Sequence, residues 1–134
     1  MRSFRIVVAA HGELADAFVS AATLICGVLH DVRPIGLSPD DSPESFSERL
    51  SAAIAGDGPV LILTDLVGGT PHNVALTLAR RMPAAIVISG VNLAVLVEAA
   101  TSTDALDPVT VERLVALGRG ALSDASTLAV SRGP

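Results

Sequence analysis

Four apolar runs, separated by segments with helical periodicity, constrain the fold of this chain more than any other feature of its sequence. The runs lie near 4–10, 31–37, 59–66 and 84–89. An apolar run without polar alternation is typical of a strand buried on both faces, as in parallel sheets. The run at 31–37 is weaker than the others, so we expect its strand near an edge of the sheet.

The intervening segments predict helices, because their apolar residues recur at intervals of three and four. Ser42-Pro43 and Asp107-Pro108 each combine a capping residue with a proline, which is typical of a helix start, and Thr70-Pro71 fits the same pattern. A fourth helix is expected over 93–101, where few charges occur and a partner subunit could pack. The first helix, from Glu13 to about residue 28, is expected to face inward through Leu14, Phe18, Ala21, Ala22 and Ile25.

Strands that alternate with helices predict an α/β fold with a parallel sheet and helices on both faces. For a chain of 134 residues we expect an open four-stranded, flavodoxin-like sheet in the order 2-1-3-4. One domain is expected over 1–122, followed by a tail over 123–134. Within that tail, Leu128-Ala129-Val130 is a candidate for a short antiparallel edge strand, in this sheet or in that of a partner subunit.

Composition excludes several classes of protein. The chain has nine arginines, no lysine and 14 acidic residues, for a net charge of −5, which disfavours binding to nucleic acid or to anionic lipid. It has no Trp or Tyr, so it lacks the aromatic platform on which bases stack. Cys26 is its single cysteine, which excludes an internal disulfide and a cysteine-based metal cluster.

The mean hydropathy of +0.58 raises the question of a membrane span. The longest stretch without a charged residue or histidine is Met82 to Val97, which is too short and too interrupted by Pro83 and Gly90 to cross a bilayer as one helix. His11 and Glu13 end the N-terminal apolar run early, so no secretory signal is expected. We expect a cytoplasmic protein that is at most peripheral to a membrane permease.

A histidine and a carboxylate meet where the strand order reverses, the usual ligand site of such folds. His11-Gly12 follows the first strand and Asp65 follows the third. Neutral imidazole is a good nucleophile near neutral pH, and a carboxylate on one ring nitrogen orients the other toward a reacting group. We therefore expect His11 and Asp65 to be catalytic.

A glycine-rich turn completes this predicted site. Gly68-Gly69-Thr70 leads into a helix, whose free N–H groups favour a phosphoryl group, and Gly12 adds backbone beside the histidine. Val91-Asn92 follows the neighbouring fourth strand and is expected to line the pocket. Each piece alone has an ordinary role as a turn or a helix cap, but together they indicate a phosphohistidine relay.

Nucleotide and metal cofactors are not expected at this site. The chain has no lysine for a Walker motif and no G-x-G-x-x-G after its first strand. We therefore expect neither a cofactor nor a metal ion.

Three segments resemble the enzyme IIA domain of mannose-family sugar phosphotransferase systems. They are IVVAAHGELADAF, LILTDLVGGTPHNVA and ISGVNLAVLVEA, and the resemblance covers about residues 4–120. It implies that His11 receives a phosphoryl group from the phosphocarrier HPr and passes it to an enzyme IIB domain. It also implies that Asp65 is the acid beside the histidine, that Thr70 is the loop hydroxyl near the phosphate, and that the protein is a homodimer. The chain departs from the family at Ala94, where proline is usual.

Other functions compete with this interpretation. The phosphoryl-transfer subunit of phosphoenolpyruvate-dependent dihydroxyacetone kinase shares the domain type, and a regulatory IIA protein without transport would share the chemistry. A ligand-binding module would leave His11 unphosphorylated. A Ser/His/Asp hydrolase would need a serine in the crevice, for which Ser89 is the nearest candidate, although no G-x-S-x-G elbow surrounds it. The chain ends before any IIB domain, so we expect a free-standing IIA protein.

Overall fold

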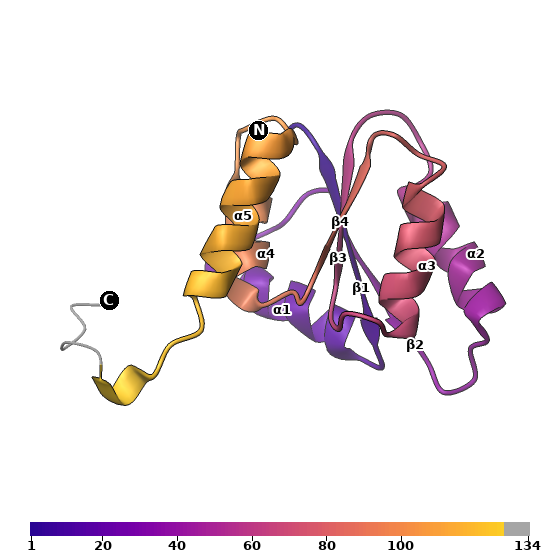
Figure 1. Ribbon diagram of the computed structural model, residues 1–134, viewed down its shortest axis with the longest axis horizontal. Helices are drawn as coiled ribbons and strands as arrows, with labels where there is room; N and C mark the ends of the chain where they lie inside the picture. Colours follow the sequence, from indigo (N-terminus) through magenta and orange to yellow (C-terminus); the bar gives the residue numbers. More distant parts are fainter. Residues whose placement is uncertain (128–134) are drawn as a thin grey trace.

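A single parallel sheet forms the centre of the computed structural model, which describes residues 1–127 (Figure 1). Its strands are β1 (Arg5–His11), β2 (Val32–Leu37), β3 (Val60–Thr64) and β4 (Ala85–Ser89). Hydrogen-bonded neighbours follow the order β2-β1-β3-β4, and every pair is parallel. The predicted fold class and strand order are confirmed, and β2 lies at an edge as expected.

Helices connect the strands and cover both faces of the sheet. They are α1 (Leu14–Cys26), α2 (Pro43–Ile54), α3 (Thr70–Ala79), α4 (Leu93–Thr101) and α5 (Pro108–Gly120), followed by the short 3-10 helix η1 (Ala125–Thr127). Figure 1 shows α1, α4 and α5 on one side of the sheet and α2 and α3 on the other. Two apolar clusters result, one under each group of helices, and alternate side chains of β1 and β3 enter one or the other.

Helix α1 faces the sheet through only part of the predicted set of side chains. Ala22 is buried and Phe18 packs against the same cluster, as predicted. Leu14 is 42% exposed and Ile25 is 60% exposed, although both were expected to point inward, and Ala15 is buried in place of Leu14. Two alanines seven residues apart let the helix backbone approach the sheet closely, which the larger side chains at the predicted positions would prevent.

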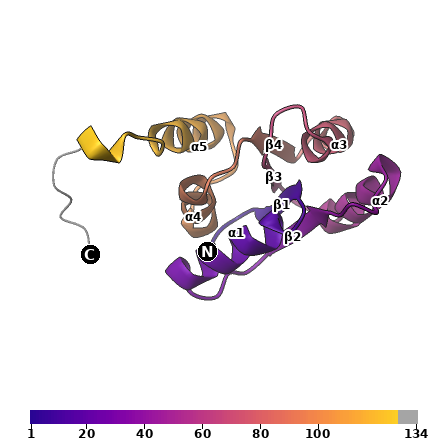
Figure 2. The same cartoon turned by 90° about the horizontal axis from the view of Figure 1, so that it is seen from below.

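Helix α4 has few charges because it packs within the chain. It contacts α1 on one side and α5 on the other, and Figure 2 shows it between them. Its side chains Val95, Leu96 and Ala99 are buried. This buried side of α4 belongs to the fold of the subunit, and packing of a partner on its remaining surface stays a prediction. The candidate edge strand at 128–130 lies outside the described residues.

The helices of residues 1–127 are all too short or too polar to traverse a lipid bilayer.

Local sequence sets most of the helix starts. Ser42 caps α2 in a reciprocal capping box, because its side chain accepts from the Ser45 amide and its own amide donates to Ser45 Oγ. Asp107 caps α5 by accepting from the Thr110 amide at 2.8 Å. These two predicted helix starts are confirmed. Helix α3 differs from prediction, because Gly69 is its N-cap and Thr70 is already helical.

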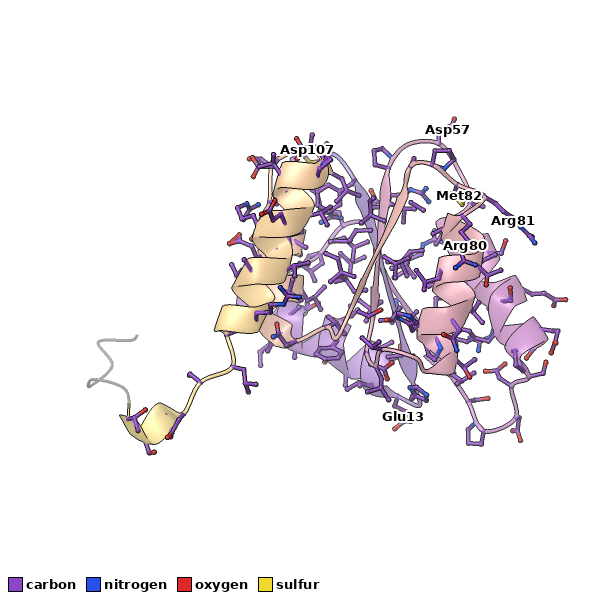
Figure 3. All side chains as sticks on the ribbon, in the orientation of Figure 1. Glu13, Asp57, Arg80, Arg81, Met82 and Asp107 are labelled. Atoms are coloured by element: carbon purple, nitrogen blue, oxygen red, sulfur yellow. The ribbon has the colours of Figure 1, made fainter. Side chains whose placement is uncertain are left out.

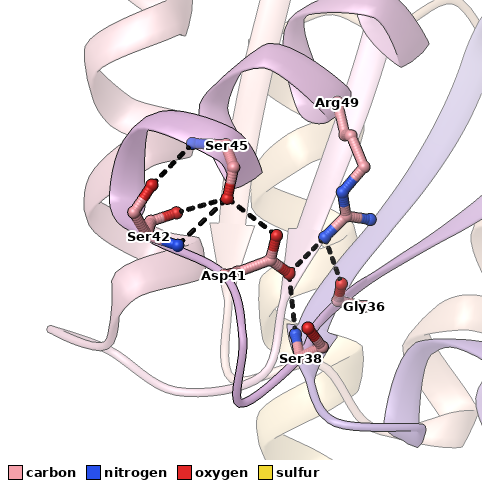
Figure 4. Close-up of polar contacts among 6 residues, drawn as sticks. All are labelled: Gly36, Ser38, Asp41, Ser42, Ser45 and Arg49. Atoms are coloured by element: carbon pink, nitrogen blue, oxygen red, sulfur yellow. Dashed lines mark hydrogen bonds and ion pairs between the residues drawn. The ribbon is translucent and has the colours of Figure 1, made fainter.

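A polar cluster fixes the loop between β2 and α2 (Figure 4). Asp41 accepts from the Ser38 amide and the Ser45 hydroxyl at 2.8 Å each, and from Arg49 at 2.5 Å. The Ser38 amide, the largest influence, and the Ser45 hydroxyl hold the pKa of Asp41 below its usual value. Arg49 also donates to the Gly36 carbonyl at 2.8 Å, so the cluster joins the loop to the end of β2.

The end of β2 in turn holds the turn that follows β1. The Gly12 amide donates to the Leu37 carbonyl at 2.8 Å, and Gly12 has a φ of +58°. A Cβ on Gly36 would lie 2.4 Å from the Gly12 carbonyl oxygen, so only glycine fits at that point of β2. The loop and the strand end therefore fix the backbone directly after His11.

Candidate functional site

His11 and Asp65 meet at the carboxyl ends of β1 and β3. His11 is the last residue of β1, and Asp65 directly follows β3. Asp65 Oδ2 lies 2.8 Å from His11 Nδ1 and accepts from the His11 backbone amide at 2.9 Å. One carboxylate oxygen therefore holds both the backbone and the ring of the histidine, which fixes the ring relative to the strand end.

This contact determines which ring nitrogen of His11 is available. A carboxylate can only accept hydrogen bonds, so in the neutral imidazole Nδ1 carries the proton and Nε2 carries the lone pair. The side chain of His11 is 46% exposed, whereas that of Asp65 is 10% exposed. The acid is therefore buried behind a histidine whose Nε2 a partner can reach.

Asp65 has no structural role in capping a helix. Its hydrogen bonds in residues 1–127 go to His11, and its second oxygen, Oδ1, is buried without a partner there. The start of the following helix is capped by Gly69, which offers no side-chain cap. A buried carboxylate oxygen without a partner is destabilising, and such groups in native proteins call for a functional explanation.

The glycine-rich turn places the start of α3 against the histidine. A Cβ on Gly69 would lie 2.8 Å from His11 Cε1 and 3.5 Å from Nε2, so the ring packs directly on the Gly69 backbone. Gly68 has a φ of +84°, a conformation that favours glycine. Thr70, the first residue of α3, directly follows Gly69, and the N-terminus of a helix leaves backbone N–H groups without intrahelical partners. The structure thus brings together His11, Gly12, Asp65 and this turn.

Val91 and Asn92 make contacts that belong to the fold, and their place in the phosphoryl pocket stays a prediction. Val91 is buried in the apolar cluster under α1, α4 and α5. Asn92 caps α4 by accepting from the Val95 amide at 2.9 Å, and its Nδ2 donates to the Gly118 carbonyl at 2.8 Å. These contacts join α4 to α5. The sequence placed both residues after a strand end correctly, and the Val91 amide donates to the Thr64 carbonyl at 2.9 Å.

A second histidine lies close to the same strand ends. His72, in the first turn of α3, has its Nδ1 2.5 Å from Ser89 Oγ, and Ser89 Oγ lies 2.6 Å from Thr64 Oγ1. Thr64 is fully buried. The contact of His72 with Ser89 depends on how α3 packs on β4, so the sequence alone does not reveal it.

Arginine side chains differ in their position relative to the site: Arg49 donates to the Gly36 carbonyl, at the end of β2 beside Gly12, whereas Arg80 follows the far end of α3. Figure 3 shows Glu13, two residues after His11, at the opposite end of the molecule from Arg80 and Arg81. The described residues contain no group of three potential metal ligands among His, Cys, Asp and Glu. The arrangement therefore offers a nucleophilic nitrogen, a buried acid behind it and a helix N-terminus beside it.

Comparison with known proteins identifies relatives with this domain. Residues 5–113 match the EIIA-man family model, described as the PTS system fructose IIA component. A sorbose-specific EIIA component of Lacticaseibacillus casei is 32% identical over 101 residues, which cover 74% of this chain and 73% of that protein. The mannose-specific EIIAB component of Escherichia coli K12 is 32% identical over 115 residues, but this chain spans only 35% of its length.

Solved structures agree with these matches. The mannose/sorbose-specific IIA subunit from Enterococcus faecalis superposes with a TM-score of 0.89 at 28% identity, covering 98% of this chain and 100% of that one. A phosphotransferase system component EIIA from Streptococcus agalactiae gives a TM-score of 0.86 at 30% identity, covering 93% and 99%. The chain therefore belongs to the mannose family of enzyme IIA components of sugar phosphotransferase systems.

Proposed function

We propose that this protein is a phosphohistidine relay that accepts a phosphoryl group from HPr on Nε2 of His11 and passes it to an enzyme IIB domain. The observation that carries the proposal is the 2.8 Å contact between Asp65 Oδ2 and His11 Nδ1. It leaves Nε2 as the nitrogen with a lone pair, beside the N-terminus of α3. Family membership supports the same chemistry.

The transfer step follows from this geometry. The Nε2 lone pair attacks the phosphorus of the donor phosphohistidine, a new N–P bond forms and the donor N–P bond breaks. The proton on Nδ1 stays in place, hydrogen-bonded to Asp65, whose negative charge stabilises the cation that develops on the ring. We infer that backbone N–H groups at the start of α3 stabilise the phosphoryl oxygens, as helix N-termini do for anions. Transfer to the IIB domain is the reverse of this step with a different acceptor.

Labelling by phosphoenolpyruvate, enzyme I and HPr tests the proposal. We expect acid-labile, base-stable phosphate on the protein and none on His11→Ala. His30→Ala and His72→Ala serve as matched controls and should still carry label at completion. Label that survives in the His11 variant would overturn the site assignment, and a wild-type protein that takes up none would overturn the function.

The contact between Ser89 and His72 supports a second candidate, a hydrolase with a Ser–His pair. Two features count against it. The hydroxyl of Ser89 also bonds Thr64, and no carboxylate bonds His72 within residues 1–127, so the pair lacks the acid that orients a catalytic histidine. Reaction with a serine-directed fluorophosphonate discriminates the two, because only the hydrolase would be modified at Ser89.

A phosphoryl-transfer subunit of dihydroxyacetone kinase and a regulatory IIA protein remain as alternatives with the same chemistry at His11. They differ in the acceptor rather than in the labelling step. Incubation of the labelled protein with a mannose-family IIB domain distinguishes them, since we expect label to move to that domain.

A further inference from the structure

A chain of three polar side chains links the ends of β3 and β4 to the first turn of α3. Thr64 and Ser89 are register partners at the last positions of their strands. Their hydroxyl oxygens are 2.6 Å apart, and Ser89 Oγ lies 2.5 Å from Nδ1 of His72. His72 is half-buried, and the proposed transfer step does not use it.

Both ends of this hydrogen-bonded series of side chains adjoin the proposed site. Thr64 directly precedes Asp65, and the Thr64 carbonyl accepts from the amides of Gly90 and Val91 at 2.9 Å each. His72 follows Gly69 by three residues, so it lies on the helical turn whose first backbone atoms pack against the His11 ring. These hydrogen bonds thus connect the end of β3, which Asp65 follows, to the start of α3, which faces the His11 ring.

We infer that His72 is a positioning residue for phosphoryl transfer at His11, an inference that rests on the proposed function. The bond between its Nδ1 and the Ser89 hydroxyl holds the first turn of α3 against the sheet. That contact sets the distance between the Gly69 backbone and the His11 ring, and so the place of the helix N–H groups relative to Nε2. Small displacements of such groups have large effects on rate, because transfer requires the reacting atoms to be aligned.

Variants at His72 separate this role from simple packing. His72→Leu removes the hydrogen bond but keeps an apolar side chain of similar bulk. His72→Asn retains a polar atom at the position of Nδ1 and can still bond the Ser89 hydroxyl. His30→Leu is the matched control, because the His30 side chain is exposed and, within residues 1–127, only its backbone carbonyl is bonded.

We expect His72→Leu to slow transfer from phospho-HPr by about 10- to 100-fold, with an unchanged KM for phospho-HPr. His72→Asn should recover most of that loss, and His30→Leu should transfer at the wild-type rate. Ser89→Ala should slow transfer similarly, and the double variant His72→Leu/Ser89→Ala should be no slower than either single variant, because both remove the same bond. A wild-type rate in His72→Leu, or no recovery in His72→Asn, would overturn the inference.

An NMR measurement keeps this inference independent of activity. The Cε1–H signal of His11 reports on the packing of the ring against Gly69. We expect it to shift in His72→Leu and to stay near its wild-type position in His72→Asn and His30→Leu. An unshifted His11 signal in His72→Leu overturns the positioning role, whereas a shifted signal in a protein that takes up no label overturns the proposed function alone.

Discussion

Replacement of Gly69 by alanine tests how closely the helix terminus must approach the active histidine. The backbone of Gly69, with φ −75° and ψ 169°, is accessible to alanine, so the added methyl group introduces no backbone strain. It would lie 2.8 Å from His11 Cε1, whereas ordinary contact begins at 3.4 Å. The ring must therefore move by about 0.6 Å, and its bond to Asp65 must lengthen or the start of α3 must shift.

Gly69→Ala is expected to lower the rate of phosphoryl transfer more than the stability of the fold. Alanine is a poorer N-cap than glycine, which costs about 1 kcal/mol of stability. The half-exposed ring of His11 can move aside, so the steric contact adds little to that cost. For transfer, a misplacement of roughly this size between the nucleophile and the groups that stabilise the phosphoryl oxygens lowers the rate by about 10²-fold.

Rapid-quench labelling from phospho-HPr measures the rate, and urea unfolding measures the stability. Gly120→Ala is the matched control, because an added methyl group there contacts nothing within 4 Å. We expect the control to transfer at the wild-type rate. A wild-type transfer rate in Gly69→Ala would refute the argument that the His11 ring must pack on the Gly69 backbone. If the variant is globally unfolded, its loss of rate reports on stability instead.

Three further predictions concern Asp65, Asp41 and the oligomeric state. Asp65→Asn should slow transfer by about 10²–10⁴-fold with the fold intact, because the amide can still accept from His11 but carries no charge; labelling rates and circular dichroism check this. The depressed pKa of Asp41 means that its ionised form stabilises the fold above about pH 3.9 and that this contribution disappears as the pH falls through the lower native value. Asp41→Asn should therefore flatten the dependence of the urea midpoint on pH below that value, and an unchanged dependence would contradict it. The protein should be a homodimer, since Leu24 and Ile25 of α1 are 89% and 60% exposed and the mean hydropathy is high; a monomer mass by light scattering at tens of micromolar would contradict it.

The sheet and its strand ends could be predicted from the sequence because their signals are local. Strands buried on both faces leave continuous apolar runs, and the rule of right-handed crossovers then limits their order. Since all four strands are parallel, their carboxyl ends must lie at one edge. This is why His11 and Asp65, 54 positions apart, could be placed together before any coordinates were considered.

The errors of prediction arise where tertiary packing selects between equally good local patterns. On α1, Leu14 and Ala15 both fit the helical spacing with Ala22, and the small Ala15 is the one that is buried. At the start of α3, Thr70 and Gly69 have similar propensities as capping residues. Gly69 takes the N-cap position, where no side chain separates the helix from His11.

The hydrogen bonds of Asp65 explain why prediction from local sequence fails beside the site, at the start of α3. One oxygen satisfies two N–H groups of His11, while the other is buried without a partner in the described structure. A structural role would satisfy both oxygens, for example by capping α3, and would make the fold more stable. Here the first turn of α3 has no side-chain cap and the acid keeps unused capacity as an acceptor. The carboxylate and the helix end thus face the same ring from two sides, and each is left free to stabilise charge that develops on the ring or on the phosphoryl group during transfer.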